Sequence, residues 1–358
     1  MELIIDVVGS CDLKCPSCPV GNSPHVKNNQ GVMTPNKLRE ILEKATREGT
    51  VDFVALYNWT EPLIHPRLPE LVRTVKSFGI PCHLSSHLNT LKNEDELMAA
   101  EPDHFRISMS GFTQENYGIT HRGGEVSKVL ENLKRLADAR TRTGAKTEIC
   151  ILYHRYLGNL DDELKLRKLA SKLDIAINPV WAYLMPLEKM LAFAYNDSSY
   201  SPMTEEDQGI LKRLALPFDQ AIEIAQRNRK QPCSLIDNQV VMNARGEVIL
   251  CCTIYDQDKY KLGNFLDRPL KDITRDKHQQ QNCKNLCETC MAKGAHVYSV
   301  YGSSEFNKSA EQNVLKHYSS ALEMNSRGSL FYFIATHLPA VRSSARFIRR
   351  YLKKFLRV

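Results

Sequence analysis

Residues 2–18 read Glu2-Leu3-Ile4-Ile5-Asp6-Val7-Val8-Gly9-Ser10-Cys11-Asp12-Leu13-Lys14-Cys15-Pro16-Ser17-Cys18, an apolar run that ends in the spacing Cys-x-x-x-Cys-x-x-Cys. Three thiolates on one short loop can bind three irons of a [4Fe-4S] cluster. The fourth iron then has no protein ligand, so it can bind and reduce a small molecule. A cluster ligated at all four irons cannot do this. The stretch therefore indicates a reactive iron–sulfur site at the end of the first strand.

Strand-like and helix-like segments alternate downstream of this loop. The predicted strands are residues 2–8, 53–57, 81–85, 104–109, 147–153 and 175–181. The predicted helices between them include residues 34–50, 69–78, 126–140 and 161–173. Such alternation with short connections predicts an α/β fold with a parallel sheet, here a partial (β/α)6 barrel. Functional side chains are then expected at the carboxyl ends of the strands.

Length and composition restrict the class of protein. The chain has 358 residues, which suits one barrel-like domain with an appendage. No apolar run approaches the roughly 18 residues of a membrane-spanning helix. Residues 1–8 are too short and too acidic for a signal peptide. Among the eleven cysteines, disulfides are therefore not expected in a reducing cytoplasm, and the closely spaced cysteines are expected to bind metal.

The positive net charge of +7 belongs to the end of the chain. Seven basic residues and no acidic ones lie between Arg342 and Arg357, and the rest of the chain has 41 basic and 41 acidic residues. The body of the protein is therefore neutral, and we expect no nucleic-acid partner. Apolar residues at helical spacing from Val341 to Phe355 predict a basic amphipathic helix. That helix suits either an anionic membrane surface or docking on the body.

Polar motifs follow the predicted strands. They are Glu61-Pro62-Leu63-Ile64-His65-Pro66, Ser85-Ser86-His87, Ser108-Met109-Ser110-Gly111 and His121-Arg122-Gly123-Gly124. The cysteine triad, the Glu61-Pro62 turn and the Ser108-Met109-Ser110-Gly111 segment occur in an order that, over roughly the first 185 residues, resembles the radical SAM superfamily. The Trp59-Thr60-Glu61 segment stands where the family has Gly-Gly-Glu, and Ser17 stands where an aromatic residue is common.

The resemblance implies a cofactor, a cosubstrate and a set of site residues. Cys11, Cys15 and Cys18 would ligate a [4Fe-4S] cluster whose open iron binds S-adenosyl-L-methionine (SAM). Glu61 would accept a hydrogen bond from the SAM amino group. Ser108 and Ser110 would lie near the ribose or the carboxylate, and Arg122 would pair with the carboxylate.

The resemblance also implies the chemistry. One electron, from a donor such as flavodoxin or ferredoxin, cleaves SAM to methionine and a 5′-deoxyadenosyl radical. The radical takes hydrogen from an unactivated C–H bond of the substrate. The protein positions the target carbon and excludes water.

A second cysteine group lies between Cys233 and Cys290. A predicted hairpin over residues 239–250, with Gly246 in its turn, precedes Cys287-Glu288-Thr289-Cys290. This resembles the SPASM or twitch extension of radical SAM enzymes, which binds auxiliary [4Fe-4S] clusters. Four cysteines are the expected ligands of one second cluster: Cys233, Cys251, Cys287 and Cys290. Cys252 is an alternative to Cys251, and Cys283 is an alternative ligand if the site is rearranged. A structural zinc site is the rival interpretation.

The remaining marked residues have plainer interpretations. Cys82 and Cys150 are expected to be buried small hydrophobes. His65 and His87 are expected to be turn residues, and Trp181 and Tyr183 either line the substrate cavity or pack in the core. The expected organisation is a core at 1–185, a helical connector at 186–232, an iron–sulfur extension at 233–300 and a helical tail at 301–358.

Three functions compete at this point. The first is oxidation or epimerisation of a sugar-like or aminocyclitol substrate, with Cys252 as a candidate hydrogen donor for epimerisation. The chain begins directly at the first strand, which leaves no expected leader-binding domain and favours this function. The second is modification of a ribosomally made peptide, and the third is a non-enzymatic metal-binding scaffold. A cytoplasmic enzyme, or one at the membrane periphery, is expected.

Overall fold

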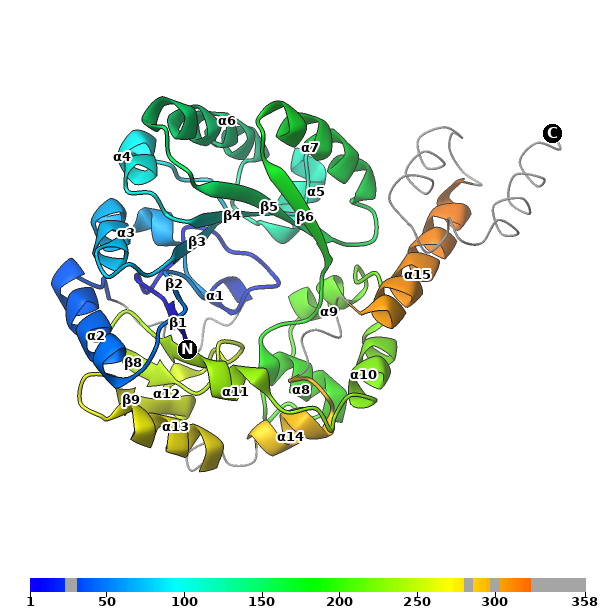
Figure 1. The fold of residues 1–358 in the computed structure, drawn as a ribbon. Helices are drawn as coiled ribbons and strands as arrows, with labels where there is room; N and C mark the ends of the chain where they lie inside the picture. The colour runs from blue at the N-terminus through cyan, green and yellow to red at the C-terminus, as the bar shows by residue number, and fades with distance from the viewer. Residues whose placement is uncertain (23–30, 280–285, 297–302, 323–358) are drawn as a thin grey trace.

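A computed structural model describes residues 1–22, 31–279, 286–296 and 303–322 (Figure 1). Its N-terminal half is built on six strands, β1 (Glu2–Ile5), β2 (Phe53–Ala55), β3 (Cys82–Ser86), β4 (His104–Met109), β5 (Glu148–Arg155) and β6 (Ala176–Trp181). Each strand pairs in parallel with the next one in the chain. The expected α/β fold with a partial (β/α)6 barrel is confirmed.

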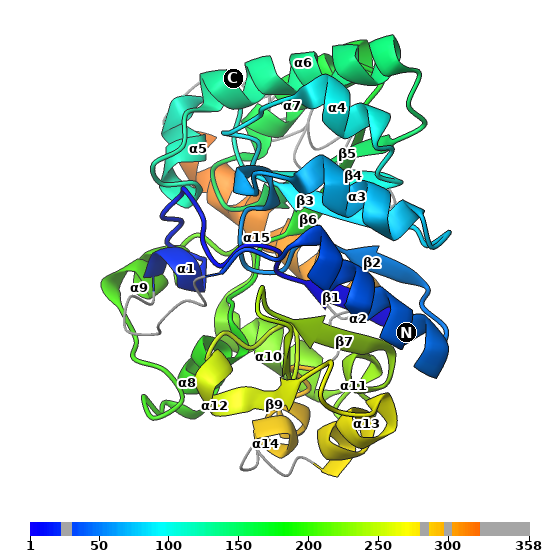
Figure 2. The same ribbon diagram turned by 90° about the vertical axis from the view of Figure 1, so that its left-hand side faces the viewer.

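Helices cover the outside of this sheet, as Figures 1 and 2 show. They are α2 (Pro35–Glu48), α3 (Leu68–Lys76), α4 (Glu94–Ala99), α6 (Val126–Thr143) and α7 (Leu160–Lys172). The shorter α1 (Pro19–Asn22), η1 (Pro62–Ile64) and α5 (Gln114–Thr120) follow β1, β2 and β4 in the chain. Helix α2 begins as its sequence predicts, because the Thr34 side chain accepts a hydrogen bond from the Lys37 amide at 3.2 Å. Helix α6 extends to Thr143 and ends at Gly144, whose φ of +69° suits glycine.

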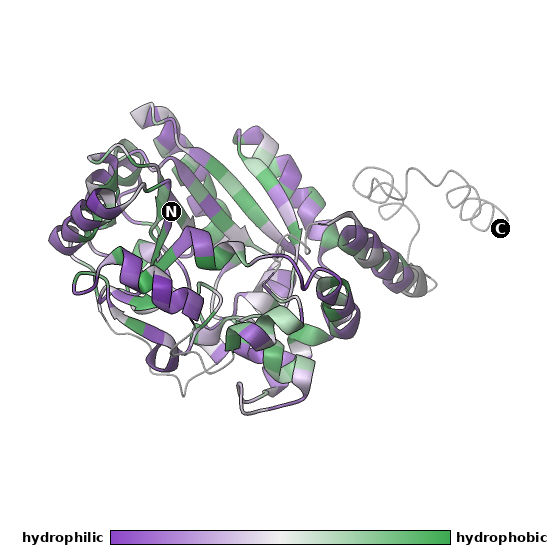
Figure 3. Cartoon of the chain, turned by 60° about the horizontal axis from the view of Figure 1, so that its bottom comes forward, coloured by the Kyte–Doolittle hydropathy of each residue, from purple (hydrophilic) through white to green (hydrophobic). Residues whose placement is uncertain are grey.

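Strand β4 shows how the sequence pattern places the site. Phe105, Ile107 and Met109 are fully buried in the core, so His104, Arg106 and Ser108 lie on the opposite face of the sheet. Figure 3 shows the same division, with hydrophobic residues concentrated on the strands and hydrophilic ones on the outer helices. The inner face of the barrel is therefore polar along β4.

Three further strands extend the barrel sheet. They are β7 (Gln239–Met242), β8 (Glu247–Ile249) and β9 (Lys261–Asn264). Gly246 forms the predicted hairpin turn between β7 and β8 with a φ of +76°. Strand β7 pairs in parallel with β1, from Gln239 opposite Glu2 to Met242 opposite Ile5. One continuous sheet therefore runs in the order β6-β5-β4-β3-β2-β1-β7-β8-β9.

The remaining helices connect the two cysteine groups and close the chain. They are α8 (Leu187–Tyr195), α9 (Glu205–Leu211), α10 (Phe218–Gln226), α11 (Ser234–Asn238), α12 (Gln257–Tyr260), α13 (Leu270–Gln279), α14 (Leu286–Ala292) and α15 (Ser304–Leu322). Phe306 and Val314 of α15 pack with Trp181 and Ala225 in a separate small core. The predicted basic helix near the end of the chain and Cys283 lie outside the described residues. Among the described helices, none is long and apolar enough to span a membrane.

Candidate functional site

The three cysteines lie on the loop between β1 and α1. A tight turn forms there, because the Cys18 amide donates to the Cys15 carbonyl at 3.1 Å and the Gly21 amide donates to the Cys18 carbonyl at 3.0 Å. A Cβ on Gly21 would lie 2.5 Å from the Cys15 carbonyl oxygen, so the loop packs this closely only on glycine. Cys11, Cys15 and Cys18 all line one cavity. The structure thus brings the predicted triad together.

A buried polar network from distant helices holds this loop. The Asn22 side chain donates to the Pro16 carbonyl at 2.6 Å and to the Asp207 carboxylate at 2.9 Å. Asp207 on α9 also forms an ion pair with Lys189 on α8 at 2.7 Å, and both side chains are 2 % exposed. Removing one member of such a buried pair typically costs about 3–5 kcal/mol. The connector helices therefore help to shape the cysteine loop.

Asp6 holds the turn that precedes Glu61. Its buried carboxylate accepts hydrogen bonds from the amides of Asn58, Trp59 and Thr60 at 2.9, 3.0 and 3.1 Å. It also accepts one from the Thr60 hydroxyl at 2.7 Å. Burial raises the pKa of Asp6, although these hydrogen bonds oppose that shift. The carboxylate fixes the backbone at the two positions where the family has glycines.

Glu61 reaches the cavity as a buried carboxylate, 2 % exposed. Its oxygens accept hydrogen bonds from the amides of Leu63 and His87, each at 3.0 Å. The His87 ring lies 3.1 Å from Glu61 and 2.9 Å from Asp12. Burial alone would lower the pKa of His87, but Glu61 and Asp12 outweigh burial and raise it to about 10. His87 therefore supplies a positive charge beside Glu61, a role beyond the turn residue expected for it.

A histidine lies beside each of two serines, Ser108 on β4 and Ser110 directly after the strand. Ser108 Oγ lies 3.1 Å from His154 Nε2, and the buried Ser110 Oγ contacts His121 Nδ1 at 2.9 Å and the Thr120 hydroxyl. Burial lowers the pKa of His121 to about 3 and that of His154 to about 4. Both rings are therefore neutral near pH 7, where they act as hydrogen-bonding groups.

The cavity that these residues share has a volume of about 310 Å³. Its wall includes Tyr57 after β2, Ser85 on β3, Arg106 on β4 and His154 on β5. Arg106 Nε donates to Ser85 Oγ at 3.2 Å, and its guanidinium lies 5.0 Å from the centre of the Tyr57 ring. Many polar side chains therefore line this cavity inside the barrel, and the cysteine loop forms part of its wall.

Arg122 does not line this cavity. Its Nε donates to the Lys14 carbonyl at 2.9 Å, and it forms an ion pair with Glu206 at 3.4 Å. The charge of Arg122 still lowers the pKa of Cys15, against burial and the neighbouring thiols, which raise it. Arg122 is thus close to the cysteine loop but is bonded to it from the outside.

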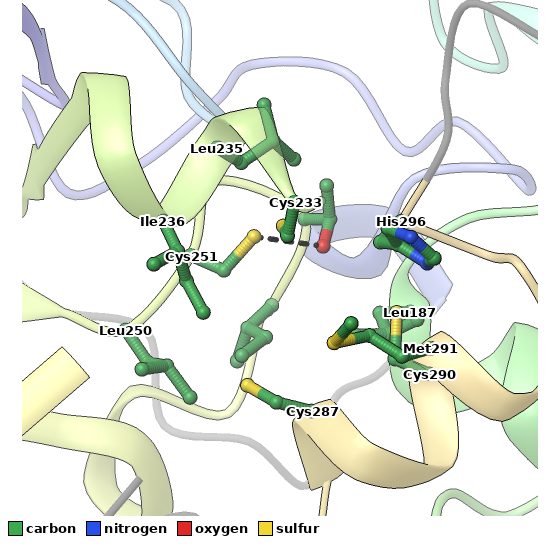
Figure 4. A pocket seen from close by; sticks show the side chains of 12 residues that line it. Leu187, Cys233, Leu235, Ile236, Leu250, Cys251, Cys287, Cys290, Met291 and His296 are labelled. Carbon is green, nitrogen blue, oxygen red and sulfur yellow. Dashed lines mark hydrogen bonds between the residues drawn. The ribbon is translucent and has the colours of Figure 1, made fainter. Parts of the chain in front are cut away.

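The second cysteine group forms a separate pocket, shown in Figure 4. Cys233, Cys251, Cys287 and Cys290 all line it, and Cys252 is absent from its wall. His296 lines it too, and its ring Nε2 lies 2.7 Å from the Gln231 carbonyl. The other ring nitrogen is buried without a partner among the described residues. The four cysteines predicted as ligands therefore lie around one site.

The adjacent cysteines differ in their surroundings. Hydrogen bonds from Cys252 and Thr253 outweigh burial and lower the pKa of Cys251 to about 6. The same contact with Cys251, together with burial, raises the pKa of Cys252. Cys252 also raises the pKa of Tyr183, which is shifted mainly by burial, while Arg106 acts to lower it. The adjacent thiols therefore interact with each other, and Cys251 lines the pocket while Cys252 does not.

One segment joins the two sites. The Trp59 ring donates to the Ile254 carbonyl at 3.0 Å and lies 6.2 Å from the Tyr255 ring, edge to face. Trp59 lines the large cavity and Ile254 lines the cysteine pocket. The carbonyl of Trp59 also lies 4.0 Å from the sulfur of Cys18. Trp59 therefore contacts Cys18 of the first group and Ile254, a residue that lines the pocket of the second group.

Comparison with known proteins identifies the class. The radical SAM superfamily matches residues 5–166, and SPASM, the iron–sulfur cluster-binding domain, matches residues 233–291. The tungsten-containing aldehyde ferredoxin oxidoreductase cofactor-modifying protein of Pyrococcus furiosus is 23 % identical in an alignment of 299 positions that covers 76 % of this chain and 80 % of that protein.

Solved structures share the fold. One is anSMEcpe with bound AdoMet, with a TM-score of 0.53 and 16 % identity over 90 % of this chain and 98 % of that one. Another is Streptococcus suis SuiB bound to S-adenosylmethionine, with a TM-score of 0.52 and 12 % identity over 76 % of this chain. The match spans 64 % of the SuiB chain, somewhat less than two-thirds of its length.

The chain belongs to the radical SAM superfamily and carries a C-terminal SPASM iron–sulfur domain. Its cofactors are therefore a [4Fe-4S] cluster that binds SAM and an auxiliary iron–sulfur cluster. The SPASM match decides against the zinc interpretation of the second group. The donor sets fit these cofactors, because three thiols face one cavity and four thiols face one pocket.

Lys277 is a buried cation beside the second group. It is 2 % exposed, and its Nζ donates to the carbonyls of Ile236, at 2.8 Å, and of Gln239. Burial lowers the pKa of Lys277, while negative charge on Cys251 and Cys233 opposes that shift. A cation that interacts with the cysteine ligands stabilises the reduced, more negative form of a cluster.

Lys277→Met is therefore expected to lower the midpoint potential of the auxiliary cluster. The expected shift is on the order of 50–100 mV, for a unit charge several ångströms away at an effective dielectric constant of about 20. An EPR-monitored redox titration measures it. Lys271→Met, at an exposed position of the same helix, is the control. Equal potentials in both variants, with the cluster retained, would contradict the role of Lys277.

Glu188 anchors the loop that follows Cys251 and Cys252. One carboxylate oxygen accepts hydrogen bonds from the amides of Tyr255 and Asp256 at 2.9 and 3.0 Å. The other oxygen is buried without a partner among the described residues. Burial raises the pKa of Glu188 from 4.5 to about 7.

The folded protein thus holds a proton at Glu188 that the unfolded chain releases above about pH 4.5. Stability is expected to fall as pH rises from about 4.5 to about 7 and to change little above that. Glu188→Gln should remove this dependence and raise the free energy of unfolding at pH 8 by up to about 3 kcal/mol, with little change at pH 5. Denaturant titrations at both pH values test this, with the exposed Glu43→Gln as control. A gain of the same size at pH 5 would contradict it.

Sequence reasoning missed several residues of these two sites. Asp6 and Arg106 could have been suspected, since both are polar residues in or directly after predicted strands. His296 has no motif around it. Lys277 has none either, because a buried lysine in a polar helix looks like any other surface lysine. These two residues become visible only through their burial and contacts.

Proposed function

We propose that the protein oxidises a secondary alcohol of a small, polar substrate of the carbohydrate or aminocyclitol type, starting at an unactivated C–H bond. The observation that carries this proposal is a cavity of about 310 Å³ with many polar side chains in its wall, which the cysteine triad and Glu61 share with Ser85, Arg106 and His154. A polyhydroxylated molecule needs many hydrogen-bonding partners, and this wall supplies them. An extended peptide would instead favour an open groove beside a strand edge.

Each predicted site residue has a role in this proposal. Cys11, Cys15 and Cys18 hold the first cluster, and Glu61 accepts a hydrogen bond from the SAM amino group. Ser108 and Ser110 bond the ribose or the carboxylate, and Arg122 turns from Glu206 toward the carboxylate. When bound, the reduced cluster and SAM supply a radical that takes hydrogen from an unactivated C–H bond.

Oxidation of the substrate releases an electron, and the protein has a candidate acceptor for it. A secondary alcohol becomes a ketone by losing one hydrogen atom, then one proton and one electron. The auxiliary cluster held by Cys233, Cys251, Cys287 and Cys290 would accept that electron, and Trp59 links the two sites. A flavodoxin or ferredoxin would supply the electron that starts each turnover.

Epimerisation is the variant reaction, with Cys252 returning hydrogen to the substrate. It is favoured by Cys252 being a thiol that does not line the auxiliary pocket and whose charge acts on Tyr183, just after β6. Cys252 does not line the cavity, however, and its thiol forms a hydrogen bond with the side chain of Cys251. Oxidation is therefore the function that the geometry supports best.

Peptide modification is the second candidate function. It is favoured by structures of the same fold that were solved with peptides, namely anSMEcpe with bound AdoMet and Cp18Cys peptide and SuiB bound to precursor peptide SuiA. Their identities of 18 % and 12 % support a common fold rather than a common substrate.

One experiment tests these proposals. Anaerobically reconstituted protein, assayed for iron and sulfide, is reduced and given SAM with a panel of sugars and aminocyclitols or a panel of peptides. We expect 5′-deoxyadenosine in stoichiometric amounts with a ketone from the first panel, and deuterium transfer from the labelled carbon. Turnover of peptides alone would reverse the assignment, and no 5′-deoxyadenosine at all would exclude both functions.

A further inference from the structure

Arg106 is a cation on the inner wall of the barrel. It belongs to the face of β4 opposite the core residues Phe105 and Ile107, and it lines the large cavity. It contacts two uncharged groups, the Ser85 hydroxyl at 3.2 Å and the Tyr57 ring, whose centre is 5.0 Å away. Within the part of the chain that the structure describes, no carboxylate forms an ion pair with it.

The acidic groups of the cavity are already committed. Glu61 is the carboxylate among the described residues that line the cavity, and it is bonded to His87. Asp12, nearby, is bonded to the same ring and to the Thr90 hydroxyl. A partly buried cation without a counter-ion is unfavourable in a medium of low dielectric constant. The cavity therefore holds one positive charge that a ligand can neutralise.

The position of Arg106 separates it from the groups expected around SAM. Arg106 lies two residues before Ser108 on β4. Arg106 is therefore about 6–7 Å further than Ser108 from the carboxyl end of the strand. Its charge acts on His154 and Tyr183, whereas that of Arg122 acts on Cys15. Arg106 thus belongs to the deeper part of the cavity, away from the cysteine loop.

The side chain is also held ready for a bidentate contact. Ser85 takes the Nε hydrogen, and the Tyr57 ring lies 5.0 Å from the guanidinium. These contacts fix the plane of the guanidinium and leave its two terminal amino groups for a ligand. Paired N–H groups in this arrangement match the oxygens of a carboxylate or a phosphate.

We propose that Arg106 binds an anionic group of the substrate, a carboxylate or a phosphate, so that the substrate is a charged small molecule such as a sugar acid or a sugar phosphate. This rests on the proposed function in that the cavity is taken as the substrate site. Arg106 would anchor the far end of the substrate and so place a C–H bond toward the cysteine loop.

Binding to the reconstituted protein with SAM tests the proposal. The probes are gluconate, glucose 6-phosphate and the neutral glucose, measured by calorimetry at constant ionic strength. We expect wild-type protein to bind one charged probe at least tenfold more tightly than glucose, and the preferred probe tells a carboxylate from a phosphate. Arg106→Gln should remove the preference and Arg106→Lys should retain part of it, while the exposed Arg39→Gln should leave it unchanged.

Two outcomes overturn the proposal. One is that the wild-type protein shows no preference for a charged probe, or a preference that Arg106→Gln does not change. The other is a SAM affinity that falls more than tenfold in Arg106→Gln, which would assign Arg106 to the SAM carboxylate. Formation of 5′-deoxyadenosine by the wild-type protein is measured separately, so a failure of the proposed function is distinguished from a failure of this one.

Discussion

Replacing Cys15 with alanine is expected to abolish SAM cleavage. The triad has one thiolate for each of three irons, so the loss of one leaves a cluster that cannot keep its SAM-binding iron in place. Loss of an outer partner of a metal ligand already costs 10–100-fold. We therefore expect 5′-deoxyadenosine formation to fall by more than about 100-fold. The iron content should fall by about half, because the auxiliary cluster stays.

The matched control is Cys150→Ala. Cys150 on β5 is 8 % exposed and lies outside both cysteine sites, so its replacement removes a buried thiol without removing a proposed ligand. Iron content and SAM cleavage should stay near those of the wild-type protein. If Cys15→Ala keeps the full iron content and cleaves SAM at the wild-type rate, the triad does not hold the cluster.

Cys251→Ala is expected to remove the auxiliary cluster, whereas Cys252→Ala, at the adjacent position, is expected to leave it in place. Cys251 lines the pocket with Cys233, Cys287 and Cys290, and its pKa is lowered to about 6, which favours the thiolate that binds iron. Cys252 does not line the pocket. Cys251→Ala should lose about half of the iron and its auxiliary EPR signal, whereas Cys252→Ala should keep both.

The same pair separates oxidation from epimerisation. Under the proposed oxidation, Cys251→Ala should lose the ketone product because the electron acceptor is gone, and Cys252→Ala should still form it. If Cys252→Ala cleaves SAM normally and forms no product, Cys252 is the hydrogen donor and the reaction is an epimerisation. Iron lost from Cys252→Ala and kept in Cys251→Ala would reverse the ligand assignment.

Much of the core could be read from the chain because its patterns are local. The residues of β4 were predicted with their observed limits, since apolar and polar side chains alternate along it. The cap at Thr34 and the turn at Gly246 also form as expected, because each depends on a few neighbouring residues. Cys82 and Cys150 are buried as predicted.

The candidate site was only partly predictable because it depends on contacts between distant segments. Asp6 is hydrogen-bonded to Thr60, which is 54 positions away in the sequence, and Asn22 is hydrogen-bonded to Asp207, which is 185 positions away. Arg122 was expected to pair with the SAM carboxylate, yet it is hydrogen-bonded to Lys14 and paired with Glu206 outside the cavity. Trp181 is packing rather than cavity wall, because it is buried with α15 in the small second core.

The spacing of Cys11, Cys15 and Cys18 by itself determined that this is an iron–sulfur protein with an open iron, because residues a few positions apart on one loop cannot be far apart in space. The alternating pattern likewise determined the parallel α/β sheet. Only the tertiary structure decided that β7 continues the sheet beside β1, that Cys251 rather than Cys252 lines the auxiliary pocket, and that Arg106 forms no ion pair with any acidic residue that the structure describes. These depend on which distant segments pack together, and burial and charge neutralisation are properties of that packing rather than of any local stretch of the chain.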